Sequence, residues 1–168
     1  MKREAGQVTR WHVVPHIGVD NVATHSWNAV QLLLELKPDA SRSLIIYVLN
    51  HDVPERWMGD VPTFCKRAFG LVHKDLDAAE RKLTEKLDLP HIDSLGENDR
   101  DWAEAIDALE SLLWCWEQRR MGNRNLDDTM KYLDDYITNG LLVPPEVKAF
   151  YHQHQGKRTT DYPMGDPI

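Results

Sequence analysis

The chain has 168 residues, of which 42% are hydrophobic, and its formal net charge is −7. This length suits one compact domain with a single core. The acidic balance argues against a protein that wraps long DNA or RNA, because such proteins need a basic face. Two cysteines exclude a disulfide scaffold, and no apolar run approaches the about 20 residues that span a bilayer. We therefore expect a soluble, cytoplasmic protein with neither a membrane nor long nucleic acid as a partner.

Two helices are predicted in the first third of the chain. The first follows Asn21, a residue type that favours the N-cap, and is stopped by Pro38. Its apolar positions recur at three- and four-residue steps and are Val22, Ala23, Trp27, Val30, Leu33 and Leu34. The second helix is capped by Ser41 and runs to His51-Asp52. Pro54 lacks an N–H group, so the helix ends or kinks there.

Four more helical patterns follow a turn at residues 59–62, and no pair of strands is predicted. They cover about residues 63–90, 98–122, 125–140 and 144–155. Asn98 or Asp99 caps the second of these, which is the clearest helix of the chain, and Gly122 ends it. The tail from about residue 156 has no regular pattern. The predicted fold is therefore all-α, with residues 1–168 forming a single bundle of about seven helices.

Four polar residues interrupt the apolar faces of three of these helices. His25 lies in the first, His51 and Asp52 close the second, and Asp107 lies in the most hydrophobic one. Alone, each is more often a hydrogen-bonded core residue, but a buried unpaired carboxylate costs several kcal/mol. Two imidazoles and two carboxylates would satisfy one another around a divalent cation. This donor set suits Zn, Mn, Fe, Co or Ni, and such an ion polarises a phosphoryl group and acidifies its water.

Two further carboxylates follow the histidine–aspartate pair. Glu55 lies three residues after Asp52, so it falls on the same side if helical geometry persists past Pro54. Glu55 is a candidate for orienting the attacking water or handling the proton of the leaving oxygen, and Asp60 is a candidate for the same work. The alternative reading is a solvated helix end for Glu55 and simple turn chemistry for Asp60.

Taken together, five motifs resemble those of a known family. In chain order they are Arg10-Trp11, Asn21–Ser26, His51–Glu55, Gly59–Thr63 and Asp107–Leu109. They are similar to the HD-domain 5'-deoxynucleotidases of bacteria and to compact phage enzymes that are dATP triphosphohydrolases. The resemblance covers about residues 10–120 and implies an all-α HD fold. It also implies an enzyme of the cytoplasm, or of the host cytoplasm if a phage encodes it.

The resemblance implies a role for each of the motif residues. The metal ligands would be His25, His51, Asp52 and Asp107, with Glu55 and Asp60 acting near the scissile phosphate. Arg10 would contact phosphate, Trp11 would lie by the sugar or base, and Lys66 would stand at the pocket edge. The cofactor would be a divalent ion such as Zn, Co or Mn, with Mg possible as a second ion. The partners would be a small deoxynucleotide and further copies of the chain in a dimer or larger homo-oligomer.

Two departures from the family pattern bear on the substrate. Thr24 stands where a glutamate often precedes the first metal histidine. His16 and Gly18 lie where a second basic residue is common, which makes His16 a candidate phosphate donor. The short chain resembles the phage enzymes, so release of triphosphate from dATP or another dNTP is preferred to release of phosphate from a dNMP. A non-catalytic HD module that binds a nucleotide as a regulator is the alternative from another class.

Overall fold

The computed structural model describes residues 2–61 and 70–155, with the backbone alone for 70–73. These residues form seven α-helices, two short 3-10 helices and no strand beyond an isolated bridge between Thr9 and Asn21. The α-helices are α1 (Val22–Leu36), α2 (Arg42–Asn50), α3 (Glu55–Met58), α5 (Gly70–Lys86), α6 (Glu97–Arg120), α7 (Asp127–Asn139) and α8 (Pro145–His154). The 3-10 helices are η1 (Lys2–Gln7) and η2 (Ile92–Ser94). The all-α prediction is confirmed, and none of the described helices is long and apolar enough to cross a bilayer.

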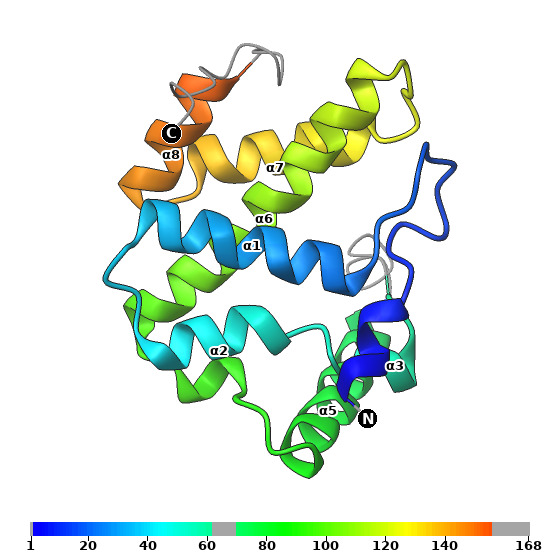
Figure 1. Ribbon diagram of the computed structural model, residues 1–168, viewed down its shortest axis with the longest axis vertical. Coiled ribbons are helices and arrows are strands. Elements are labelled where there is room, and N and C mark those ends of the chain that lie inside the picture. Colours follow the sequence, from blue (N-terminus) through cyan, green and yellow to red (C-terminus); the bar gives the residue numbers. More distant parts are fainter. Residues whose placement is uncertain (1, 62–69, 156–168) are drawn as a thin grey trace, which may run out of the picture.

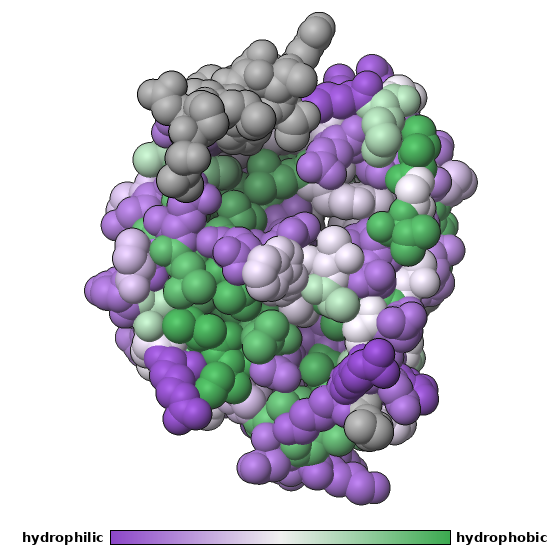
Figure 2. Space-filling model, in the orientation of Figure 1, coloured by the Kyte–Doolittle hydropathy of each residue, from purple (hydrophilic) through white to green (hydrophobic). Residues whose placement is uncertain are grey.

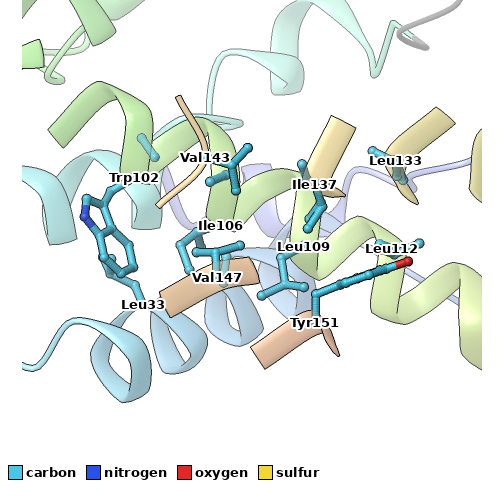
Figure 3. Packing of buried hydrophobic residues seen from close by; sticks show 14 of the residues in the cluster. Leu33, Trp102, Ile106, Leu109, Leu112, Leu133, Ile137, Val143, Val147 and Tyr151 are labelled. Carbon is cyan, nitrogen blue, oxygen red and sulfur yellow. The ribbon is translucent and has the colours of Figure 1, made fainter. Parts of the chain in front are cut away.

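Helix α6 runs through the middle of the molecule and contacts α1, α2, α7 and α8 (Figure 1). Its buried side chains include Ile106, Leu109 and Leu112, which are fully enclosed. Figure 3 shows them packed against Leu33 of α1 and Ile137 of α7, with residues of α8 closing the cluster. Because one helix carries the centre of the core, polar residues on its remaining face are held rigidly against α1 and α2.

The ends of the helices follow local rules. The Asn21 side chain accepts a hydrogen bond from the Thr24 N–H at 2.9 Å, and the Ser41 hydroxyl accepts one from Leu44 N–H at 3.1 Å. Both capping predictions are thereby confirmed. Gly122 closes α6 in the left-handed conformation with φ of 90°, which a glycine adopts without strain.

Two helix starts differ from the prediction. Helix α6 begins at Glu97, with Gly96 at the N-cap, so it includes the two polar residues that were expected to cap it. Helix α7 begins at Asp127 because Asn125 is engaged elsewhere, donating its side-chain N–H to the Pro15 carbonyl at 3.1 Å. The structure thus uses this asparagine to hold a loop.

The buried face of α1 also differs from the predicted apolar stripe. Trp27 is 62% exposed and Leu34 is 38% exposed, whereas His25 is completely buried. Residues two apart on a helix point in nearly opposite directions, so the rotation that buries His25 turns Trp27 outward. Figure 2 shows hydrophobic residues gathered on the face of the molecule over α1 and α2. Apolar periodicity misjudged this helix because its inner face is built around an imidazole.

Between η1 and α1 the chain makes an irregular excursion, the 9–21 loop. Its two ends are joined by the bridge between Thr9 and Asn21 and by the Arg10 N–H, which donates to the Asp20 carbonyl at 3.1 Å. Farther out, the Ile17 N–H donates to the side-chain oxygen of Gln118, whose amide N–H donates back to the Ile17 carbonyl, both at 2.8 Å. The loop is therefore tied to the C-terminal part of α6.

Candidate active site

Two helices and a turn bring four of the predicted residues together in what we term the His/Asp centre, defined as His25, His51, Asp52 and Asp107. The Nε2 atom of His25 lies 3.0 Å from Asp107 Oδ1 and 3.5 Å from Asp52 Oδ2. The Nε2 atom of His51 lies 3.2 Å from Asp52 Oδ1 and 3.6 Å from Asp107 Oδ1. His25 comes from α1 and Asp107 from α6, while His51 and Asp52 occupy the turn after α2.

The donor atoms of the His/Asp centre suit a divalent cation. Although the contacts are short, neither Nε2 has a hydrogen bond of acceptable geometry, and both are buried. Ligand atoms of His25, His51 and Asp52 all lie within 4.8 Å of one another. The side chain of Asp107 is 48% exposed because it faces a cavity. Two imidazole nitrogens and carboxylate oxygens that converge in this way fit Zn, Co, Mn or a similar ion.

Charges around the centre are strongly coupled. Burial disfavours the imidazolium form of His25, but the adjacent carboxylates of Asp107 and Glu110 outweigh it and raise the pKa of His25 to about 10. Burial also disfavours the imidazolium form of His51, but the charges of Asp52 and Asp107 outweigh burial and raise the pKa of His51 to about 9. In return the two imidazoles outweigh desolvation by the surrounding protein and hold the pKa of Asp107 well below its usual value. In the metal-free centre the protonated imidazoles of His25 and His51 therefore supply the positive charge that a bound cation would supply.

Glu55 stands beside this centre at the first residue of α3. Helix α2 ends at Asn50, earlier than the predicted stop at Pro54, and the chain passes through a turn in which the Glu55 N–H donates to the Asp52 carbonyl at 3.1 Å. Pro54 is the N-cap of α3 and has a right-handed helical conformation. The Oε2 atom of Glu55 is buried without a hydrogen bond. Burial, followed by the charges of Asp52 and Asp60, raises the pKa of Glu55 to about 8. Such a carboxyl group is protonated near neutral pH and can donate that proton.

Arg10 connects the 9–21 loop to the centre. Its Nη1 donates to Asp52 Oδ2 at 2.9 Å, its Nη2 donates to the Ser111 hydroxyl at 3.1 Å, and its Nε lies 3.4 Å from Asp20 Oδ2. The guanidinium is thus fixed on three sides. Asp60 fixes the same loop, because its Oδ2 accepts a hydrogen bond from the Trp11 N–H at 3.2 Å.

A cavity of about 640 Å³ opens onto Asp107 and Arg10. Its walls come from the 9–21 loop, α6, α7 and Asp60. The lining residues are Arg10, Trp11, Val13, Val14, Asp60, Glu104, Asp107, Ala108, Ser111, Asp128, Thr129, Tyr132, Leu133 and Tyr136. Among these described residues Arg10 is the only basic one. The volume lies within the range of small-molecule sites.

Of the remaining predicted substrate contacts, Trp11, His16 and Lys66, only Trp11 is found in the described lining of the cavity. Trp11 lines the cavity, and its ring is stacked on Trp114 with centroids 5.0 Å apart. Its φ of 60° is a left-handed conformation that bulky residues rarely adopt, so the stack and the hydrogen bond to Asp60 hold it against strain. His16 lies 2.9 Å from the Val14 carbonyl through Nδ1 and is not among the residues that line the cavity. Lys66 lies outside the described residues.

Sequence reasoning missed the second layer of polar residues. Glu110 is buried and bonded to His25 Nδ1, and Asp20 is buried between Arg10 and the Trp11 indole N–H, which donates to it at 3.0 Å. Glu110 carried one signal, since it lies three residues after Asp107 and therefore on the same face of the most apolar helix. The only local signal for Asp20 is its position directly before Asn21, the N-cap of α1.

A family model described as 5'-deoxynucleotidase YfbR-like matches residues 3–156. Among solved structures, the HD phosphohydrolase DatZ of cyanophage S-2L, bound to dA and one catalytic Zn2+ ion, is similar with a TM-score of 0.67. The identity is 18%, over 91% of this chain and 91% of that chain. No curated protein sequence matches.

The family match covers most of the chain, including every described residue of the site. It confirms the predicted resemblance to the 5'-deoxynucleotidases and the predicted enzyme class, a hydrolase of deoxynucleotides. The likeness to the phage structure, at this low identity, confirms the helical fold. The chain belongs to the YfbR-like 5'-deoxynucleotidase family.

Proposed function

We propose that this protein is a 5'-deoxynucleotidase that releases phosphate from deoxynucleoside monophosphates. The observation that carries the proposal is the charge of the cavity: Arg10 is the only basic residue in its described lining, against the carboxylates of Asp60, Glu104, Asp107 and Asp128. The negative charge of one phosphate is balanced by the positive charges of one guanidinium and one divalent cation. A triphosphate would bring several more negative charges beside four acids.

In this proposal His25, His51, Asp52 and Asp107 hold the divalent ion. When bound there, such an ion supplies Lewis acidity to the phosphoryl group and brings the pKa of a water molecule towards neutrality. Arg10, already oriented by Ser111 and Asp52, binds a phosphate oxygen. These contacts fix the phosphorus next to the centre.

Glu55 is proposed to protonate the leaving 5'-oxygen. It is the buried carboxyl group that keeps a proton at neutral pH, with its pKa raised to about 8 by burial and by its acidic neighbours. Asp60 is proposed to act chiefly by holding the 9–21 loop through the Trp11 N–H, and its negative charge also keeps Glu55 protonated.

The remaining walls suit a nucleoside. Tyr132 and Tyr136 lie one turn apart on α7, and Val13 and Leu133 add apolar surface. The related phage structure holds dA, which supports a deoxynucleoside as the occupant of the corresponding cavity here.

The test is a panel of incubations with the purified protein. Mn, Co, Zn or Mg is combined with each dNMP, each dNTP and the ribose versions, and chromatography resolves phosphate, pyrophosphate and triphosphate. We expect phosphate from dNMPs and little product from dNTPs. Release of triphosphate would instead support the activity suggested by the resemblance to the compact phage enzymes. Bound metal without turnover would indicate a regulatory module, and a His51→Ala preparation controls for contaminating phosphatases.

A further inference from the structure

Glu110 is a buried acid that the proposed chemistry does not use. Its side chain lies on α6, only 4% of the residue is exposed, and it is not among the residues that line the cavity. A carboxylate in such a place is costly unless its oxygens are bonded.

Both oxygens of Glu110 are engaged by α1. One is hydrogen-bonded to His25 Nδ1, and the other accepts from the Asn28 side-chain N–H at 3.3 Å. His25 and Asn28 are three residues apart on α1, as Asp107 and Glu110 are on α6, so each pair shares one helix face. The facing pairs connect the two helices at the His/Asp centre.

This arrangement determines which nitrogen of His25 faces the centre. A carboxylate accepts, so Nδ1 must carry the hydrogen, and the lone pair of the neutral ring then lies on Nε2. That atom is the one 3.0 Å from Asp107 Oδ1 and 3.5 Å from Asp52 Oδ2. The ring is consequently fixed in both orientation and tautomer.

The second imidazole of the centre is held differently. His51 Nδ1 lies 2.8 Å from the Val48 carbonyl, which is a neutral acceptor. A charged acceptor polarises an imidazole more strongly than a carbonyl does, and it makes the opposite nitrogen a better ligand. The two histidines are therefore not equivalent, and the difference is due to Glu110.

We propose that Glu110 is a positioning residue for the metal: it fixes His25 with Nε2 towards the cation and strengthens that nitrogen as a ligand. The inference rests on the proposed function in so far as it needs a cation at the centre. Residues that support metal-binding histidines in this way change metal affinity about 10- to 100-fold when substituted.

The first test compares Zn²⁺ affinity by chelator competition for the wild type, Glu110→Gln and the control Glu117→Gln, an exposed acid two turns farther along α6. Glu110→Gln should weaken the Kd for Zn²⁺ by about 10- to 100-fold, with the control unchanged. Excess metal should restore kcat in Glu110→Gln, which a merely structural defect would not allow. A Kd within about twofold of the wild type would overturn the inference.

The second test needs no variant and therefore does not depend on whether Glu110→Gln folds. Nitrogen-15 NMR of the Zn²⁺-loaded wild type reports which ring nitrogen of His25 carries hydrogen. We expect the hydrogen on Nδ1 of His25. A hydrogen on Nε2 would overturn the inference while leaving the proposed function intact. A wild-type chain that binds no Zn²⁺ would overturn both, so the two failures are distinguishable.

Discussion

The two halves of the candidate site are built in opposite ways. The His/Asp centre takes its residues from α1, α6 and the turn directly after α2, and neighbouring positions of these helices belong to the core. The 9–21 loop has no regular structure, yet it presents Arg10 and Trp11 and is anchored by Gln118 and Asn123 near the end of α6. Chemistry placed on helices is positioned by packing, whereas chemistry placed on a loop must be positioned by specific buried hydrogen bonds.

The largest expected effect comes from Asp52, which belongs to the His/Asp centre and also contacts Arg10 of the loop. Asp52→Ala removes a proposed ligand next to His51 and the acceptor of Arg10 Nη1. We expect loss of Zn²⁺ binding and a fall in turnover of at least about a thousandfold, with helical content retained by circular dichroism. Asp39→Ala, in the exposed connection between α1 and α2, is the control. Normal turnover in Asp52→Ala would refute the assignment of the centre.

Glu55→Gln tests whether the carboxyl group beside the centre moves a proton. It should lower kcat by about 100- to 10,000-fold while leaving Zn²⁺ affinity unchanged. The pKa of Glu55 is raised to about 8, so the proton-donating form is lost as pH rises, and a nearby cation shifts this loss to lower pH. The wild-type rate should therefore fall on an alkaline limb at or below about pH 8 that Glu55→Gln lacks. An unaltered pH profile would exclude this role; Glu35→Gln, exposed on α1, is the control.

Acidification should weaken metal binding at the His/Asp centre. In the metal-free protein the pKa values of His25 and His51 are raised to about 10 and about 9, so both rings carry an extra proton at neutral pH. A cation must displace these protons, so affinity falls as pH falls, by up to about a hundredfold per pH unit. Calorimetric titration with Mn²⁺ in buffers of different ionisation enthalpy measures the released protons. Binding without proton release would contradict the charge state described for the centre.

The smallest expected effect concerns the loop. Gln118→Met keeps the side-chain volume but removes both hydrogen bonds to Ile17. We expect a loss of about 1 to 3 kcal/mol in the free energy of unfolding. KM should rise by less than about tenfold, because the cavity wall loosens while the centre is untouched. Denaturant unfolding and steady-state kinetics check this, with Gln31→Met on the exposed face of α1 as the control. A Zn²⁺ affinity that changed as much as KM would show that the halves are not separable.

The same contrast explains what could be predicted from the sequence. Helix caps at Asn21 and Ser41, and the stop at Gly122, were predictable because they follow from local backbone chemistry. The convergence of His25, His51, Asp52 and Asp107 was predictable because polar residues stood out on apolar helix faces. The outward position of Trp27 was not, since periodicity counts a tryptophan as core and a histidine as surface.

The anchoring of the loop was also beyond sequence reasoning. Gln118 and Asn123 are separated from their partners Ile17 and Pro15 by about a hundred residues of chain, and neither amide belongs to a recognised pattern. The contact of His16, the candidate phosphate donor, with the Val14 carbonyl through Nδ1 was not predicted either. Long-range hydrogen bonds between a side chain and the backbone leave no periodic trace in a sequence.

Asp52 has a consequence for how the two binding events depend on each other. Its carboxylate accepts from Arg10 and also contacts both imidazoles, so a cation bound at the centre as proposed would draw negative charge away from the guanidinium. An arginine relieved of its counter-ion attracts phosphate more strongly. By thermodynamic reciprocity, phosphate would then tighten the cation to the same degree, and the proposed ligand and ion would bind cooperatively.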